Sequence, residues 1–186
     1  MQEAKRSKAK TTAKRPSLTR HKAAIETQFS DRKQNELNGK LKEAANRGAN
    51  AEIMRLLDAG ADVDAGIRDK GTTPLMWAAR GGYAKTCELL IKKGANIEMM
   101  DEENNFTSLM WAAWIDSAKV CAILLAKGAK TDTISKLNQR TALDLAEFQE
   151  NKETAAFLKS MEKMQESVGT ESFRSFLSDF WDCVAG

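Results

Sequence analysis

The chain has 186 residues, 30% of them charged, and a formal net charge of +3. This length holds one modest domain, and no apolar run approaches the ~20 residues that a membrane-spanning helix needs. The first residues lack the apolar core of a secretory signal, and the three cysteines show no ligand spacing. We therefore expect a protein of a reducing compartment, the cytoplasm or the nucleus.

The charge is unevenly distributed along the chain. Residues 1–33 carry ten basic and three acidic side chains, so that their net charge is +7 and that of the remainder is −4. Residues 1–18 have too little apolar surface to offset the entropy of ordering, and we expect a disordered basic tail. Residues 19–34 can form an N-terminal capping helix, because Ile25 and Phe29 share one helix face.

The rest of the chain repeats with a period of 34 residues. The sequence TPLMWAA at residues 73–79 returns as TSLMWAA at residues 107–113, and more weakly from Thr141. A second motif, in which a pair of aliphatic residues is followed a few residues later by Gly-Ala, recurs with the same period. The glycines of that series are Gly60, Gly94 and Gly128. Such a period is typical of stacked units that bury a core only against their neighbours.

Local chemistry predicts two helices in each unit. Thr73 is a good N-cap, and Pro74 stands at the first helical position, where proline is tolerated. The first helix ends at the glycines of residues 81–82, and a second helix is expected over residues 85–93. Gly94 can close that helix in the left-handed conformation, and an extended hairpin-like loop then returns the chain to the next threonine.

These motifs resemble the ankyrin repeat over residues 36–160. Met76 and Met110 replace the histidine of the family's T-P-L-H motif, and the period is one residue longer than usual. Four units are expected, at residues 36–68, 69–101, 102–135 and 136–160. The resemblance implies an all-α solenoid of about four helix-turn-helix units with short hairpin loops. It also implies a concave protein-binding face and a role as an adaptor, scaffold or inhibitor.

The resemblance further implies which residues face a partner. They are those just before the cap threonine and just after the Ala-Ala pair. In this chain the candidate partner-binding residues are Thr72, Arg80, Phe106, Trp114, Ile115, Arg140 and Phe148. Aromatic and arginine side chains are enriched in binding hot spots. The alternative is that one or more of them pack beneath adjacent loops as core.

Two further pairs of residues are expected in the core. Trp77 and Trp111 alternate with core alanines, which favours packing. Cys87 and Cys121 lie one period apart on successive second helices, which is typical of small buried residues rather than of a disulfide or metal site.

The C-terminal residues 170–186 are predicted to form an amphipathic helix. Its apolar residues follow a helical i, i+3, i+4, i+7 pattern. The residues expected to dock are Phe173, Phe176, Leu177, Phe180 and Trp181. The helix can cap the last repeat, enter a groove of a partner, or fold onto the concave face.

Catalysis is not expected. The only histidine, His21, lies in the basic tail, and no cluster of His, Cys and Asp has metal-ligand spacing. We expect no cofactor and no metal.

Three functional classes fit the sequence. The first is a protein-interaction module, monomeric and not inserted in a membrane. The second is a nuclear or nucleic-acid-associated regulator that uses the basic tail, although this tail lacks aromatic residues for base stacking. The third is a structural subunit held in an assembly by the C-terminal helix.

Overall fold

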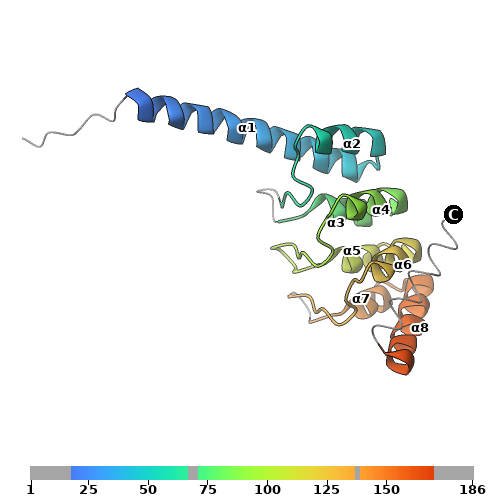
Figure 1. The fold of residues 1–186 in the computed structure, drawn as a ribbon. Helices are drawn as coiled ribbons and strands as arrows, with labels where there is room; N and C mark the ends of the chain where they lie inside the picture. The colour runs from blue at the N-terminus through green and yellow to red at the C-terminus, as the bar shows by residue number, and fades with distance from the viewer. Residues whose placement is uncertain (1–17, 67–70, 137–138, 170–186) are drawn as a thin grey trace, which may run out of the picture. The chain divides into compact units, whose positions relative to one another are not determined.

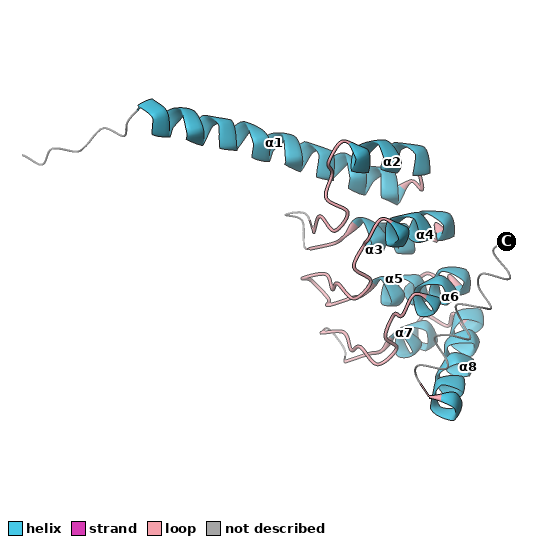
Figure 2. Ribbon diagram, in the orientation of Figure 1, coloured by secondary structure: helices cyan, strands magenta, loops and turns pink. Residues whose placement is uncertain are grey.

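The computed structural model describes residues 18–66, 71–136 and 139–169, with the backbone alone for residues 18–26 and 168. Within these residues the regular structure consists of eight helices without strands (Figures 1 and 2). They are α1 (Leu18–Asn46), α2 (Asn50–Asp58), α3 (Pro74–Arg80), α4 (Ala84–Lys92), α5 (Ser108–Trp114), α6 (Ala118–Ala126), α7 (Ala142–Phe148) and α8 (Lys152–Val168). The prediction of an all-α stack of helix pairs is confirmed.

The helices pack as successive pairs along the stack. The inner helices α3, α5 and α7 contact one another in sequence, and the outer helices α4, α6 and α8 do the same. In Figure 1 the loops that join one pair to the next all lie on the same side of the stack. The inner helices therefore have equivalent orientations in the stack. Residues one period apart occupy equivalent positions on neighbouring inner helices.

The inner helices begin at threonine caps, as the sequence predicts. The hydroxyl oxygens of Thr73, Thr107 and Thr141 each accept a hydrogen bond from the backbone N–H three residues later, at 3.2–3.4 Å. At Thr141 the Asp144 carboxylate also accepts from the Thr141 N–H, which completes a capping box. These bonds satisfy donors that a helix start otherwise leaves without partners.

The outer helices end at the repeating glycine. Gly60, Gly94 and Gly128 have φ values of 93°, 93° and 96°, which lie in the region that favours glycine. One period later the sequence has Glu162 in place of glycine. As expected from this absence, the last helix continues, and α8 ends only at Val168.

The first repeat takes its inner helix from the end of α1. Leu41, Ala44 and Ala45 are fully buried in the same core cluster as Ile53 of α2. The residues of the possible capping helix, 19–34, belong to one continuous helix over Leu18–Asn46. Residues up to 33 and residues from 34 onward form separate sets of contacts. The boundaries of the individual repeats stay predictions.

The connecting loops are tied together by a ladder of polar contacts. The Asp64 carboxylate accepts from the backbone N–H of Asn96 at 2.8 Å, and the Glu98 carboxylate accepts from that of Lys130 at 3.0 Å. These bonds join loops of successive repeats and fix their spacing. No helix in the described part of the chain is long and apolar enough to span a membrane.

The two cysteines of the outer helices belong to the core. Cys87 and Cys121 are fully buried free thiols, and burial raises the pKa of each to about 12. They are therefore protonated at neutral pH, which confirms their predicted role as small apolar residues. Among the described residues, no group of three or more His, Cys, Asp and Glu side chains is placed to hold a metal ion.

Candidate functional site

The inner helices carry a ladder of cations and indole rings. Arg80, the last residue of α3, has its guanidinium carbon 5.2 Å from the centre of the Trp77 ring and 5.0 Å from that of Trp111 on α5. The ammonium nitrogen of Lys42, on α1, lies 5.3 Å from the same Trp77 ring centre. Each distance is within the ~6 Å range of a cation–π contact. The ladder thus links three successive inner helices.

Phe106 is buried and packs against Trp111 of this ladder. Its side chain is only 5% exposed. Its ring meets that of Trp111 edge to face at 5.2 Å and is tilted against that of Trp114 at 6.1 Å. It belongs to the core cluster. Phe106 is therefore not an exposed member of the predicted patch but a support for the two tryptophans, which is the alternative that the sequence left open.

Two large aromatic side chains at equivalent positions remain exposed. Trp114 ends α5 and is 36% exposed, and Phe148 ends α7 and is 57% exposed. The guanidinium of Arg140 covers one face of the Phe148 ring at 3.7 Å. Arg80, Trp114 and Phe148 occupy the same position in three successive repeats, so that they form one row along the inner helices.

The remaining predicted residues, Ile115 and Thr72, contribute less to the exposed patch. Ile115 is half-buried and lies beside Gly82 of the preceding repeat, where an added Cβ would stand 3.5 Å from its Cδ1. Thr72 is half-buried. Ile115 therefore has a packing role between repeats, and the structure adds no contact that assigns a role to Thr72.

Trp77 and Trp111 do more than fill the core. Both pack against the core cluster, as predicted, but both are only half-buried. Their rings also contact the cations described above. Trp111 donates from Nε1 to the Asp101 carboxylate at 3.1 Å. The Trp77 Nε1 is buried without a hydrogen-bond partner among the described residues. One period before Asp101 the sequence has Ile67, whose side chain offers no acceptor.

The sequence contained a signal for this ladder. Trp77 and Arg80 are three residues apart, a spacing that brings two side chains together on a helix. The contact of Arg80 with Trp111 joins different repeats and required the structure. We call Trp77, Arg80, Trp111, Trp114, Arg140 and Phe148 the inner-helix surface.

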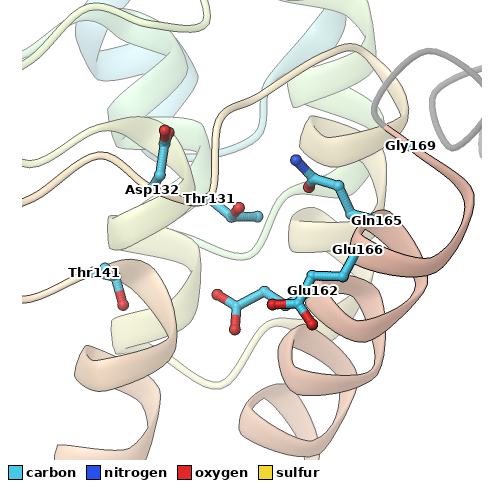
Figure 3. A pocket seen from close by; sticks show the side chains of 7 residues that line it. All are labelled: Thr131, Asp132, Thr141, Glu162, Gln165, Glu166 and Gly169. Carbon is cyan, nitrogen blue, oxygen red and sulfur yellow. The ribbon is translucent and has the colours of Figure 1, made fainter.

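A separate pocket of about 450 Å³ lies at the end of the stack (Figure 3). It is lined by Thr131, Asp132, Thr141, Glu162, Gln165, Glu166 and Gly169. In Figure 3, the side chains of Glu162, Gln165 and Glu166 come from α8. Burial, together with the charges of Asp144, Glu166 and Glu147, raises the pKa of Glu162 above its usual range. Sequence reasoning did not predict this pocket, because it is lined jointly by α8 and by the loop after α6, which are distant in the sequence.

The residues expected to dock the C-terminal helix lie outside the described residues. This applies to all five, Phe173 to Trp181. Their docking on the fourth repeat therefore stays a prediction.

Comparison with known proteins supports the repeat assignment. A family model described as ankyrin repeats (3 copies) matches residues 41–135. The fourth helix pair, α7 and α8, follows the matched residues. No curated protein is significantly similar to the chain.

Proposed function

Because the chain belongs to the ankyrin repeat family, we propose that it is a non-catalytic module that binds another protein through its inner-helix surface. Repeats of this family commonly act as protein-interaction modules. The stack of short helices supplies a rigid support, and the residues that vary on its surface supply the recognition.

One observation carries this proposal. Trp114 and Phe148 are exposed at equivalent ends of neighbouring inner helices, and Arg80 and Arg140 lie against aromatic rings of the same surface. Tryptophan and arginine are the residues most enriched in binding hot spots, which are packed clusters surrounded by near-neutral contacts. The buried Phe106 ring contacts Trp114 at 6.1 Å, and this contact favours one position of the indole ring before a partner binds. Such pre-organisation reduces the entropy cost of binding.

The described cysteines give no reason to propose a catalytic activity in addition to binding. Nucleophilic catalysis by cysteine needs a thiolate. The thiols of Cys87 and Cys121 are buried and have a pKa of about 12. The alternatives based on the basic tail and on residues 170–186 rest on the sequence alone, and no observation within the described residues favours them.

Site-specific photo-crosslinking in a cell extract tests the proposal. A benzoylphenylalanine at position 148 keeps an aromatic ring on the inner-helix surface. A matched benzoylphenylalanine at Lys119, an exposed residue of outer helix α6, presents the same reactive group on another side. We expect position 148 to capture a discrete partner protein that position 119 does not capture.

The proposal is contradicted if position 119 captures that partner and position 148 does not. It is equally contradicted if neither position captures a protein. Circular dichroism of both labelled chains must show the helical content of the unmodified protein, so that each result refers to a folded stack.

A further inference from the structure

We propose that the inner-helix surface recognises an extended acidic peptide segment of its partner. One carboxylate of the segment is bound at Arg80, a second at Arg140, and an apolar side chain between them lies on Trp114. This inference rests on the proposed function and adds the chemistry of the partner.

The stacking of Arg80 leaves its hydrogen-bonding edge available. The two indole rings of Trp77 and Trp111 lie near the guanidinium, at 5.2 and 5.0 Å, and the side chain is exposed. Within the described residues Arg80 makes no hydrogen bond or ion pair. The N–H donors of a guanidinium lie in its plane, in a fork that matches a carboxylate. A carboxylate of a partner can therefore form a bidentate pair there.

Arg140 also has donor capacity that the described residues do not use. It is half-buried, with one face on the Phe148 ring at 3.7 Å. Its Nη1 atom is buried and has no hydrogen-bond partner among the described residues. An unsatisfied donor on a partly desolvated charged group is unfavourable. Because Nη1 is buried, an incoming carboxylate must reach the guanidinium through its other nitrogens, where it would compensate the positive charge.

The buried acid beside this ladder, Asp101, forms no ion pair with Arg80 or Arg140 among the described residues. Asp101 is buried, and its two carboxylate oxygens accept from Trp111 Nε1 at 3.1 Å and from the Asn104 N–H at 2.7 Å. Lys42 adds a further cation at the Trp77 ring. The surface therefore combines cations with aromatic rings, although residues 34–186 carry a net charge of −4. An acidic, partly apolar segment is its electrostatic complement.

The repeat geometry sets the spacing of the two acids. Arg80 lies at the end of α3, and the Phe148 ring that holds Arg140 lies at the end of α7, with α5 and Trp114 between them. Two neighbouring-helix distances amount to about 16–20 Å. An extended chain advances roughly 3.3 Å per residue, so that the two acids should stand about five or six residues apart.

A displayed library of random twelve-residue peptides, selected on the full chain, tests this inference. We expect enriched peptides with two Asp or Glu residues about five or six positions apart and an apolar residue between them. One such peptide, made synthetically, should bind Arg80→Gln/Arg140→Gln about tenfold or more weakly, as expected for lost charge-assisted hydrogen bonds. Arg80→Lys/Arg140→Lys should also weaken binding, because lysine keeps the charge but loses the planar fork.

The matched control removes the same charge from the outer helices. Lys85 and Lys119 are exposed on α4 and α6, and Lys85→Gln/Lys119→Gln should change the affinity by less than about twofold, as a distant screened charge would. Circular dichroism confirms that each variant is folded before its affinity is compared.

The outcomes distinguish a failure of the acidic-segment proposal from a failure of the proposed function. Peptides that lose affinity with Trp114→Ala but not with the Arg80 and Arg140 variants, and that show no enrichment of acids, overturn the acidic segment and leave the binding surface in place. No enrichment of any peptide, or peptides that bind all of these variants equally, overturns both the acidic segment and the proposed function.

Discussion

The guanidinium of Arg80 lies 5.0 Å from the centre of the Trp111 ring, which belongs to the next inner helix. The same guanidinium is 5.2 Å from Trp77 on its own helix. Arg80 therefore joins two repeats at the surface that we propose for binding. In a repeat protein the contacts between neighbours supply much of the stability, so that Arg80 supports the fold in addition to the binding role that we propose for it.

This contact predicts an energetic coupling between the two residues. In a double-mutant cycle of Arg80→Gln and Trp111→Leu, the free energy of unfolding should show a coupling of about 0.5–1 kcal/mol, as for a cation–π pair near the surface. Urea denaturation of the four proteins measures it. A cycle of Lys85→Gln with Trp111→Leu is the control, since Lys85 lies on an outer helix. Equal coupling in both cycles would contradict the contact.

Core and surface residues of α5 should respond differently to truncation. Leu109 is 1% exposed, and Leu109→Ala should lower the free energy of unfolding by roughly 2–5 kcal/mol. Trp114→Ala should lower it less but weaken partner binding by about 1–3 kcal/mol. Thermal unfolding and titration of the folded variants with the partner separate the two quantities. If Trp114→Ala unfolds the domain and the folded fraction binds normally, Trp114 is a core residue.

Much of the fold could be predicted from local chemistry. Threonine at residues 73, 107 and 141 sets the start of each inner helix, and glycine at residues 60, 94 and 128 sets the end of each outer helix. Each of these residues determines the backbone conformation of its immediate neighbours, and each recurs with the repeat period. The replacement of the next glycine by Glu162 also predicted that the last helix would continue.

What could not be predicted depends on contacts between distant residues. Residues 19–46 contain no proline, and the helix passes through Gly39, where an added Cβ would meet nothing within 4 Å. No local signal therefore separated a capping helix from the first repeat. Phe106 precedes a cap threonine, as Thr72 and Arg140 do, but its ring is enclosed by Trp111 and Trp114. The period places these residues in one row and does not tell which of them is covered.

The stability of the stack should depend on the protonation of Glu162. Burial raises the pKa of this carboxyl above its usual value of 4.5, and nearby Asp144 and Glu166 add to the effect. The folded state then binds the proton more tightly than the unfolded state does. The resulting contribution to stability is fully present below the unfolded-state pKa and is lost as the pH rises through the folded-state pKa.

Glu162→Gln removes this titration. The substitution should therefore improve stability relative to the natural chain more at pH 7 than at pH 4, as measured by urea denaturation across that range. Glu153→Gln, at an exposed position in the first turn of the same helix, controls for the loss of one negative charge. An equal effect of Glu162→Gln at both pH values would show that Glu162 titrates alike in the folded and unfolded states.

Residues 170–186 should contribute to the stability of the last repeat. Their apolar stripe predicts a helix that needs a surface, because an isolated helix of this length is marginal in water. Truncation after Gly169 should lower the melting temperature and increase the exposure of Trp111 or Trp114 to a soluble quencher, measured against a full-length Trp181→Phe variant because the truncation also removes Trp181. An unchanged melting curve would instead favour a segment that is free to bind a partner.

Hydrogen exchange of the chain with and without its bound partner tests the central claim most directly. Binding at the inner-helix surface should slow the exchange of amides at the ends of α3, α5 and α7, around Arg80, Trp114 and Phe148. The outer helices α4 and α6 should change little. Slower exchange confined to α4 and α6, with the inner helix ends unchanged, would contradict the account.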